Sequence, residues 1–352
     1  MRPARDSWVN PALALCLCAV AGGVFAGLRL PLPWMIGPLA AMAVFNFAGA
    51  GLRAPRGGRE CGQIVIGTAL GLYFSPVVAR EVASYWHLLL IAGVFAILIG
   101  AAAGWMLSRA AGIDRTTAFF SSVAGGAAEM TTLGERYGAR PDRVALAQSV
   151  RILAVVVVVP FALTYSGAHG SDLYLPASLP VDWTKLAGLL CVAALAGLLV
   201  SMLGVPNAFM FGPLAAVIAL TVSEVHFSSL PAILSNSAQV VLGCALGSRF
   251  ERRSFQSAPR FLAAVLASVA FAMALAAGFA ALLAWASGLP FASLVLATAP
   301  GGIAEMCITA QVLQLGVPLV TAAHVTRVLV LITTTGPTYR AVRAWRERFR
   351  KR

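Results

Sequence analysis

The stretch Ser122-Val-Ala-Gly-Gly-Ala-Ala-Glu-Met130 returns later in the chain as Thr298-Ala-Pro-Gly-Gly-Ile-Ala-Glu-Met306. In both copies a glycine pair precedes a Glu-Met pair at the same spacing. Between Phe261 and Tyr339 the sequence has only three ionisable Asp, Glu, Lys, Arg or His residues, which are Glu305, His324 and Arg327. A charge at the centre of a membrane helix costs about 2.5 to 3.5 kcal/mol. A carboxylate in such apolar surroundings therefore needs a structural or functional partner.

The composition around these copies is that of an all-α polytopic membrane protein. Of 352 residues, 59% are hydrophobic and 11% are charged, and the mean hydropathy is +0.85. Apolar runs long enough to cross a bilayer as helices recur with short breaks. We predict six segments in each half, at 12–29, 34–51, 61–79, 86–108, 116–134 and 144–166, and then at 184–203, 208–224, 232–249, 261–287, 291–313 and 319–339.

The two halves are related by a duplication. Gln63-Ile-Val-Ile-Gly-Thr-Ala-Leu-Gly71 matches Gln239-Val-Val-Leu-Gly-Cys-Ala-Leu-Gly247 at an offset of 176 residues, and the glycine pairs, glutamates and arginines Arg151 and Arg327 share that offset. The earlier blocks Gly37-Pro38 and Gly212-Pro213 match at 175. Matched blocks in one order indicate an internal repeat. We assign residues 1–170 to the first repeat, 171–340 to the second, and 341–352 to a basic cytoplasmic tail.

The positions of basic residues in the loops predict that the repeats are inverted. Short cytoplasmic loops carry an excess of Lys and Arg. Basic residues flank both ends of the first Gly-Gly segment, and the loops around the second carry no charge. If every basic loop is cytoplasmic, neither Gly-Gly segment crosses the membrane. Each half then has about five transmembrane helices plus one re-entrant or broken element. The basic residues used are Arg53, Arg56, Arg59, Arg109, Arg115, Arg136, Arg140, Arg143, Arg249, Arg252, Arg253, Arg260 and the C-terminal arginines.

Two further regions bear on this topology. The central loop 167–183 contains His169, Asp172 and Asp182 but no Lys or Arg, as an external loop should, whereas Arg29 falls in a loop that the scheme places outside. Arg2 and Arg5 before an apolar run resemble a signal peptide. We reject that interpretation because the run corresponds to the start of the second repeat.

The net charge of +13 raises the alternative of nucleic-acid binding. Its excess lies in short loops and in the tail Arg340 to Arg352, which is the distribution of topogenic charge or of a lipid-binding stretch. We expect no direct binding of nucleic acid.

The sequence offers no set of residues for an enzyme, a cofactor or a metal. The four histidines are far apart, and the six cysteines lie in or beside apolar segments without ligand spacing, so we interpret the cysteines as packing residues. We predict no catalytic residues, no cofactor and no metal site.

The candidate binding residues gather around the repeated stretch. Glycine pairs allow a helix to break, and the amide groups at the start of a half-helix suit an anion. Either each glutamate pairs with its arginine structurally, or the arginines hold an anionic substrate while a glutamate carries a coupling proton or binds a cation. His324 shares a helix face with Arg327, although Gln148 replaces it in the first repeat. The substrate or ion candidates are Gly125, Gly126, Glu129, Arg151, Gly301, Gly302, Glu305, His324 and Arg327.

The paired Gly37-Pro38 and Gly212-Pro213 interrupt apolar segments at matching places. A proline removes a backbone donor inside a helix. These four residues are candidates for hinges, with a packing kink as the alternative.

The paired blocks resemble one bacterial family. Pro33-Trp-Met-Ile-Gly-Pro-Leu-Ala40 and Phe211-Gly-Pro-Leu-Ala215, each followed by its Gly-Gly-x-x-Glu-Met segment, are similar to the AbrB membrane family, over about residues 12 to 340. That family has an internal duplication, includes the regulator of aidB expression, and is often labelled ammonia monooxygenase. The resemblance implies a link to regulation of gene expression. The monooxygenase label fits poorly, because no metal-ligand set is visible. The architecture is also similar to that of cation/proton antiporters and anion transporters with inverted repeats.

Two functions follow from these observations. The first is a secondary transporter of a small, anionic solute coupled to a proton or cation. The second is a non-transporting membrane regulator that acts through a ligand or a cytoplasmic partner. In both cases we expect the bacterial inner membrane, both termini in the cytoplasm, the lipid bilayer and a small-molecule or ion substrate as partners, and leave homo-oligomerisation open.

Overall fold

A computed structural model gives the structure of residues 9–168, 170, 180–225, 227–250 and 259–350, and in residues 335–350 only the backbone is described. Within these ranges every regular element is an α-helix. Several residues of the topology argument lie outside the described residues: Arg2, Arg5, His169, Asp172, Arg252, Arg253, Lys351 and Arg352. The side chains of the arginines from Arg340 to Arg350 are likewise outside the description.

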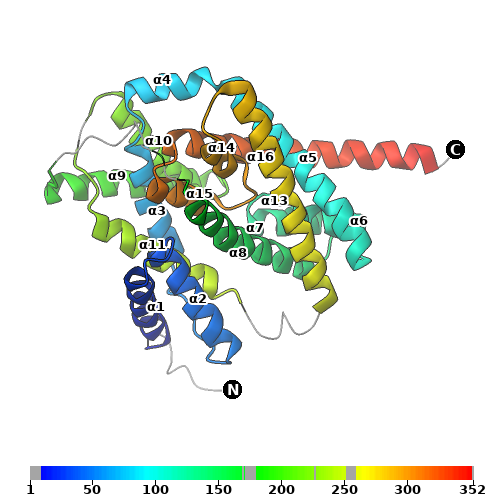
Figure 1. Cartoon of the computed structure of the whole chain (residues 1–352), viewed down its shortest axis with the longest axis horizontal. Coiled ribbons are helices and arrows are strands. Elements are labelled where there is room, and N and C mark those ends of the chain that lie inside the picture. The colour runs from blue at the N-terminus through cyan, green and yellow to red at the C-terminus, as the bar shows by residue number, and fades with distance from the viewer. Residues whose placement is uncertain (1–8, 169, 171–179, 226, 251–258, 351–352) are drawn as a thin grey trace. The chain divides into compact units, whose positions relative to one another are not determined.

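The helices follow the predicted order in both repeats (Figure 1). The first repeat has α1 (Val9–Gly27), α2 (Pro33–Phe47), α3 (Gly58–Gly71), α4 (Pro76–Ser84), α5 (Trp86–Ala111), α6 (Arg115–Ser122), α7 (Ala127–Arg136) and α8 (Pro141–Tyr165). The second has α9 (Trp183–Met202), α10 (Ala208–Val222), α11 (Ala232–Gly247), α13 (Pro259–Ser287), α14 (Phe291–Thr298), α15 (Ile303–Leu313) and α16 (Val317–Arg350).

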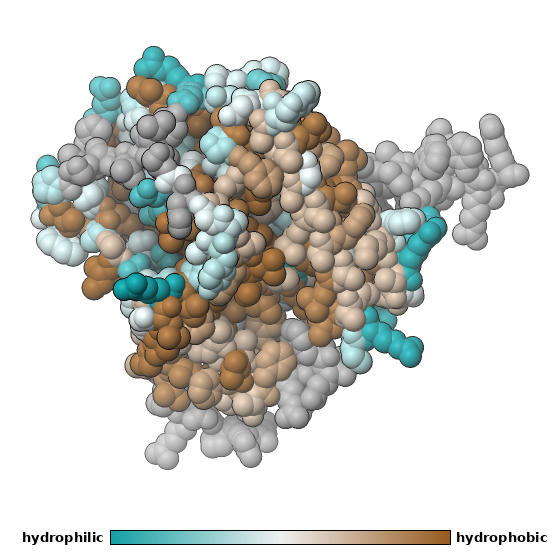
Figure 2. All heavy atoms as spheres, viewed as in Figure 1, coloured by the Kyte–Doolittle hydropathy of each residue, from teal (hydrophilic) through white to brown (hydrophobic). Residues whose placement is uncertain are grey.

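The lengths and composition of these helices confirm a polytopic membrane protein. Six described helices are long and apolar enough to cross a membrane, and a seventh span is counted if α3 and α4, bent by 90°, form one. Large hydrophobic side chains are exposed, among them Val20, Leu28, Trp105 and Leu199, and Figure 2 shows hydrophobic residues over much of the visible face. Such a surface suits contact with lipid rather than water.

The chain forms two compact units, and each takes helices from both repeats. Unit 1 contains residues 1–81, 156–259 and 304–318, and unit 2 contains residues 82–155, 260–303 and 319–352. Compactness therefore follows a different division from the sequence repeats.

Unit 1 is built on reciprocal glycine contacts between the repeats. A Cβ atom at Gly67 on α3 would lie 2.8 Å from the carbonyl oxygen of Met210 on α10. The equivalent Gly243 on α11 meets Met35 of α2 in the same way. Gly71 and Gly247 form the next pair of contacts, with Val217 and Met42. Close approach of backbones through small residues is the usual way in which membrane helices associate.

One contact in unit 2 supports the prediction that the repeats run in opposite directions. The contact is between α5 and α13, which occupy equivalent places in the two repeats. The rings of Phe95 and Phe279 stack with centroids 3.7 Å apart, and further along Ile99 and Ala103 cluster with Ala272 and Ala276. Helices α5 and α13 are therefore antiparallel where they touch. Parallel repeats would make equivalent helices run the same way, so this contact supports the predicted inversion.

The backbone repeats as well as the sequence. Arg29, Glu224 and Gln314 have left-handed φ values of 54°, 59° and 54°, and their equivalents are glycines with positive φ, Gly204, Gly49 and Gly138. Only glycine adopts this conformation without steric cost. At each of these three positions one repeat has glycine, and the other has a residue with a side chain in the strained left-handed conformation.

Candidate functional site

The first Gly-Gly stretch is a break between two short helices. Helix α6 ends at Ser122, Val123 and Gly126 are extended, and α7 starts at Ala127. The far ends of the two helices lie together, because Thr117 accepts a hydrogen bond from the backbone N–H of Arg140 at 2.9 Å and Phe120 stacks on Tyr137. The element returns to where it began, as a re-entrant hairpin does.

The glycine pair leaves room for the two side chains that follow it. A Cβ atom at Gly125 would lie 2.7 Å from Cε of Met130, and a Cβ atom at Gly126 would collide with the carboxylate of Glu129. Glu129 and Met130 fold back over the glycines. This accounts for the Gly-Gly-x-x-Glu-Met spacing by steric fit.

The second stretch breaks in the same way. Helix α14 ends at Thr298, Ala299 is extended with φ −55° and ψ 137°, and α15 begins at Ile303. The break belongs to unit 2 up to Ile303, after which the chain enters unit 1.

One buried arginine holds the carbonyl end of each break. Arg151 donates from Nη1 to the carbonyl of Val123 at 2.7 Å and from Nη2 to that of Gly125 at 3.2 Å. Arg327 donates to the equivalent carbonyls of Ala299 and Gly301, both at 2.7 Å. The two side chains belong to residues that are 3% and 4% exposed. The last carbonyls of a helix lack intrahelical partners and carry partial negative charge, so the guanidinium satisfies both the geometry and the charge.

A second donor stands beside each arginine. Gln148 donates from Nε2 to the carbonyl of Phe120 at 2.7 Å and to that of Val123 at 3.0 Å. His324, at the equivalent position, contacts the carbonyl of Leu296 through Nε2 at 2.9 Å. Because the partner is a carbonyl, this ring nitrogen carries the hydrogen. Sequence reasoning missed Gln148 as a site residue, although its match to His324 in the repeat was a signal for it.

The remaining atoms of these two side chains are also equivalent. Oε1 of Gln148 and Nδ1 of His324 are buried and have no hydrogen-bond partner among the described residues. Both are acceptors, so each break has one buried acceptor available to a donor.

The glutamates lie at the opposite, amide ends of the breaks. Glu129 is in the first turn of α7 and Glu305 is in the first turn of α15, and both are half-buried. The ion pairs found in the described part of the chain join Arg140 and Arg143 to Asp142, and Lys185 to Asp182. Arg151 donates to backbone carbonyls, and the carboxylate of Glu129 lies against Gly126. Each charge instead meets the helix end of opposite partial charge.

The hinge candidates lie at close helix contacts. Both Pro38 and Pro213 are inside continuous helices. A Cβ atom at Gly37 would lie 2.7 Å from the carbonyl oxygen of Ala21, and one at Gly212 would lie 2.5 Å from that of Ala196. These contacts supply the packing role that the sequence left open. The hinge role stays a prediction.

The described residues contain no group of three or more His, Cys, Asp or Glu side chains placed to hold a metal ion. The breaks therefore present backbone amides, two carboxylates and two neutral acceptors. These groups suit binding of a small polar solute or ion.

A comparison with known protein families identifies the family of this chain. A family model described as "Transition state regulatory protein AbrB" matches residues 34–343, which include both breaks and both arginines. The chain belongs to the AbrB family. This AbrB chain is 27% identical over 327 residues to the Escherichia coli (strain K12) protein named "Putative regulator AbrB", covering 92% of this chain and 93% of that protein. It is 28% identical over 372 residues to "Uncharacterized protein YhjN" of Bacillus subtilis (strain 168), covering 96% and 92%.

Proposed function

We propose that this chain is a secondary transporter of a small, anionic solute, coupled to a proton or a cation. The observation that carries the proposal is the pair of helix breaks, one in each inverted repeat, with buried arginine at the carbonyl end and a half-buried glutamate at the amide end. Broken helices at membrane depth are tolerated where they are buried in protein or line a polar cavity. In transporters with inverted repeats they form the substrate and ion sites.

The groups divide the work in this proposal. Arg151 and Arg327 hold the carbonyls of Gly125 and Gly301 in place, so they position the breaks and contribute positive potential. The amides at Gly126 and Gly302 bind the anionic group of the solute, and Oε1 of Gln148 and Nδ1 of His324 accept a hydrogen bond from an N–H or O–H group that the solute carries. Glu129 and Glu305 carry the coupling proton or bind the coupling cation.

The two units suggest how such a protein would move. Each unit combines equivalent helices from both repeats. Alternating access in inverted-repeat transporters is largely a rigid-body motion of one bundle against another. We assign that motion to units 1 and 2.

The same proposal includes the orientation in the membrane. We propose that both termini are in the cytoplasm and that the membrane is the bacterial inner membrane; the arginines of the loops and of the C-terminal end of α16 support this orientation. An effect on gene expression would then be indirect, through a changed concentration of the solute in the cytoplasm.

Flux through proteoliposomes tests the proposal. Vesicles loaded with a pH-sensitive dye would be given gradients of succinate, glutamate or phosphate, and internal pH would be followed. We expect protein-dependent flux with one of these anions, lowered about tenfold or more by Glu129→Gln or Glu305→Gln, since a hydrogen bond to a charged group contributes about 1.5 to 3 kcal/mol. Glu135→Gln is the matched control, because Glu135 is on the same helix as Glu129 but exposed. Unchanged flux in both test variants would sink the proposal.

The second candidate function is a membrane regulator without transport. It is favoured by the word regulator in the name of the E. coli relative. In that case deletion of residues 341–352 would abolish the effect on gene expression, and the glutamate variants would leave it unchanged. Loss of the effect in the glutamate variants with the tail intact would favour transport.

A further inference from the structure

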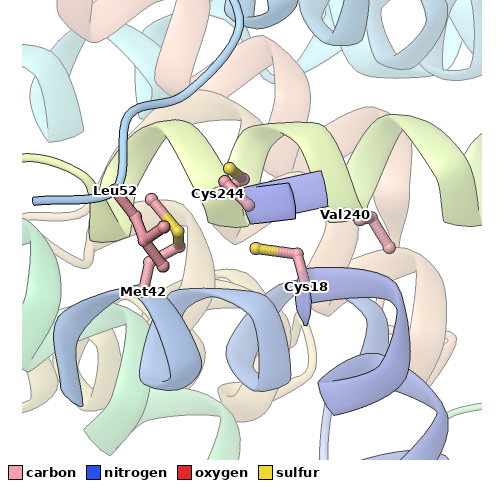
Figure 3. Packing of buried hydrophobic residues seen from close by; sticks show 6 residues of the cluster. Cys18, Met42, Leu52, Val240 and Cys244 are labelled. Carbon is pink, nitrogen blue, oxygen red and sulfur yellow. The ribbon is translucent and has the colours of Figure 1, made fainter. Parts of the chain in front are cut away.

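Three sulfur-bearing side chains from three helices share one buried core cluster of unit 1. Cys18 on α1, Met42 on α2 and Cys244 on α11 are each fully buried and belong to one core cluster with Ala14, Leu52 and Val240. Figure 3 shows the three sulfur-bearing side chains directed into the space between their helices. In the sequence these residues are far apart and have no ligand spacing, so only the fold brings them together.

The contacts of the cluster are close and fixed by the surrounding backbone. Cys18 and Cys244 lie in the same buried cluster as Met42, on helices α1 and α11. Sγ of Cys18 also donates to the carbonyl of Pro38 at 3.7 Å. Met42 is held on its other side by Gly247, where an added Cβ atom would lie 2.6 Å from Cβ of Met42. The sulfurs therefore belong to helices whose separation is set by glycine contacts.

The other repeat shows that packing does not require sulfur at this place. The equivalents of Cys18, Met42 and Cys244 are Ala193, Val217 and Thr68. Ala193 and Val217 also form a buried cluster, and Thr68 is buried with its hydroxyl bonded to the carbonyl of Ile64 at 2.8 Å. The same helix contacts are thus made without a sulfur atom. A role in binding explains why this cluster contains three sulfur-bearing side chains and the equivalent cluster of the other repeat contains none.

We propose that Cys18, Met42 and Cys244 form a binding site for a soft monovalent metal ion, Cu(I) being the natural candidate. Thiolate and thioether ligands select Cu(I) over harder divalent ions. On binding, the metal–sulfur bond to one cysteine replaces its S–H bond and releases one proton, while the second thiol and the thioether donate lone pairs. The complex is then neutral, which suits a buried apolar place where a net charge would be costly.

Copper competition on the full-length protein tests this site. The starting protein would carry Cys16→Ser, Cys61→Ser and Cys191→Ser, because these three thiols are exposed and could bind metal at the surface. Cu(I) would be supplied under ascorbate as its bicinchoninate complex, and metal transfer followed by loss of the complex's colour. We expect one Cu(I) per chain and a sulfur-only coordination shell by X-ray absorption.

In the test variants each sulfur-bearing residue is replaced by the residue at the equivalent position of the other repeat. Cys18→Ala and Cys244→Thr should each weaken Cu(I) binding on the order of a hundredfold, and Met42→Val about tenfold, since second-shell changes alone cost 10- to 100-fold in metal sites. Thermal unfolding should show stabilisation by Cu(I) in the starting protein but not in the triple variant, which separates loss of the site from loss of the fold.

Three results would overturn the proposal. The first is equal binding by the starting protein and the triple variant. The second is a coordination shell of nitrogen or oxygen. The third is a mass loss of two hydrogens on exposure to Cu(II) with no metal retained, which would make Cys18 and Cys244 an oxidation-prone pair instead.

Discussion

The two helix breaks solve the same problem with partly different residues. Both use an arginine on the following long helix to bind two carbonyls of the break, and the donor–acceptor distances agree within 0.5 Å. Both add a neutral donor three residues earlier, which is Gln148 in one repeat and His324 in the other. Both breaks have side-chain donors for their backbone carbonyls, because carbonyls at a helix end have no partner within the helix. The identity of the neutral donor is free to differ.

The largest expected effect comes from removing the arginine of either break. Arg327→Ala removes the side-chain donor to the carbonyls of Ala299 and Gly301, and Arg151→Ala removes the donor to Gly125 and one of the donors to Val123. A buried acceptor left unsatisfied costs about 1 to 3 kcal/mol. We expect poor folding, measured as a lower midpoint of thermal unfolding in detergent. Lysine at either position keeps the charge but not the two-pronged geometry, so it should fall between the arginine and alanine proteins. If one alanine variant unfolds early and the other does not, the two breaks are not equivalent.

A smaller effect is expected at the first glycine pair. Gly126→Ala places the new methyl group against the Glu129 carboxylate. Glu129 must then leave its present rotamer, which costs about 0.5 to 1.5 kcal/mol. The double variant Gly126→Ala with Glu129→Ala should recover most of the loss, because the clash partner is gone. Gly23→Ala is the control, since a Cβ atom there meets nothing within 4 Å. Additive losses in the double variant would contradict the steric explanation.

The smallest effect is expected from exchanging the neutral donors. His324→Gln keeps an N–H that can reach the carbonyl of Leu296, as Gln148 does for Phe120. It should therefore lower thermal stability less than His324→Ala, because the buried carbonyl keeps its donor. His324→Ala removes the donor and should cost about 1 to 3 kcal/mol. The comparison also sharpens the transport proposal. If His324→Gln preserves stability but abolishes the pH dependence of flux, the histidine has a role in proton movement that Gln148 does not share.

Most of the segment boundaries could be predicted from hydropathy. The observed helices α5, α9 and α13 start and end within about three residues of the predicted segments, because a long apolar run in lipid has helix as its only stable form. The short helix α4 was not predicted. Its residues continue the run of α3, and the 90° bend after Gly71 depends on how the chain packs.

The candidate site was predicted in its members but not in its contacts. The glutamates, arginines and glycine pairs could be recognised because charge is rare in apolar segments and because the repeat marks each of them twice. The sequence left open whether glutamate and arginine bind each other. In the first repeat the structure shows Arg151 on backbone carbonyls and Glu129 over Gly126, an arrangement invisible in sequence because carbonyls are present at every residue.

The sequence by itself determined the class of the protein and its duplication, because burial in lipid is governed by composition. It also predicts that the halves have opposite orientations, because topology follows the charge of short loops. Only the tertiary structure decided which helices form a compact unit, which atoms each buried arginine binds, and that Cys18, Met42 and Cys244 meet. These depend on close approach between segments more than 20 residues apart, and one-dimensional spacing carries no record of it.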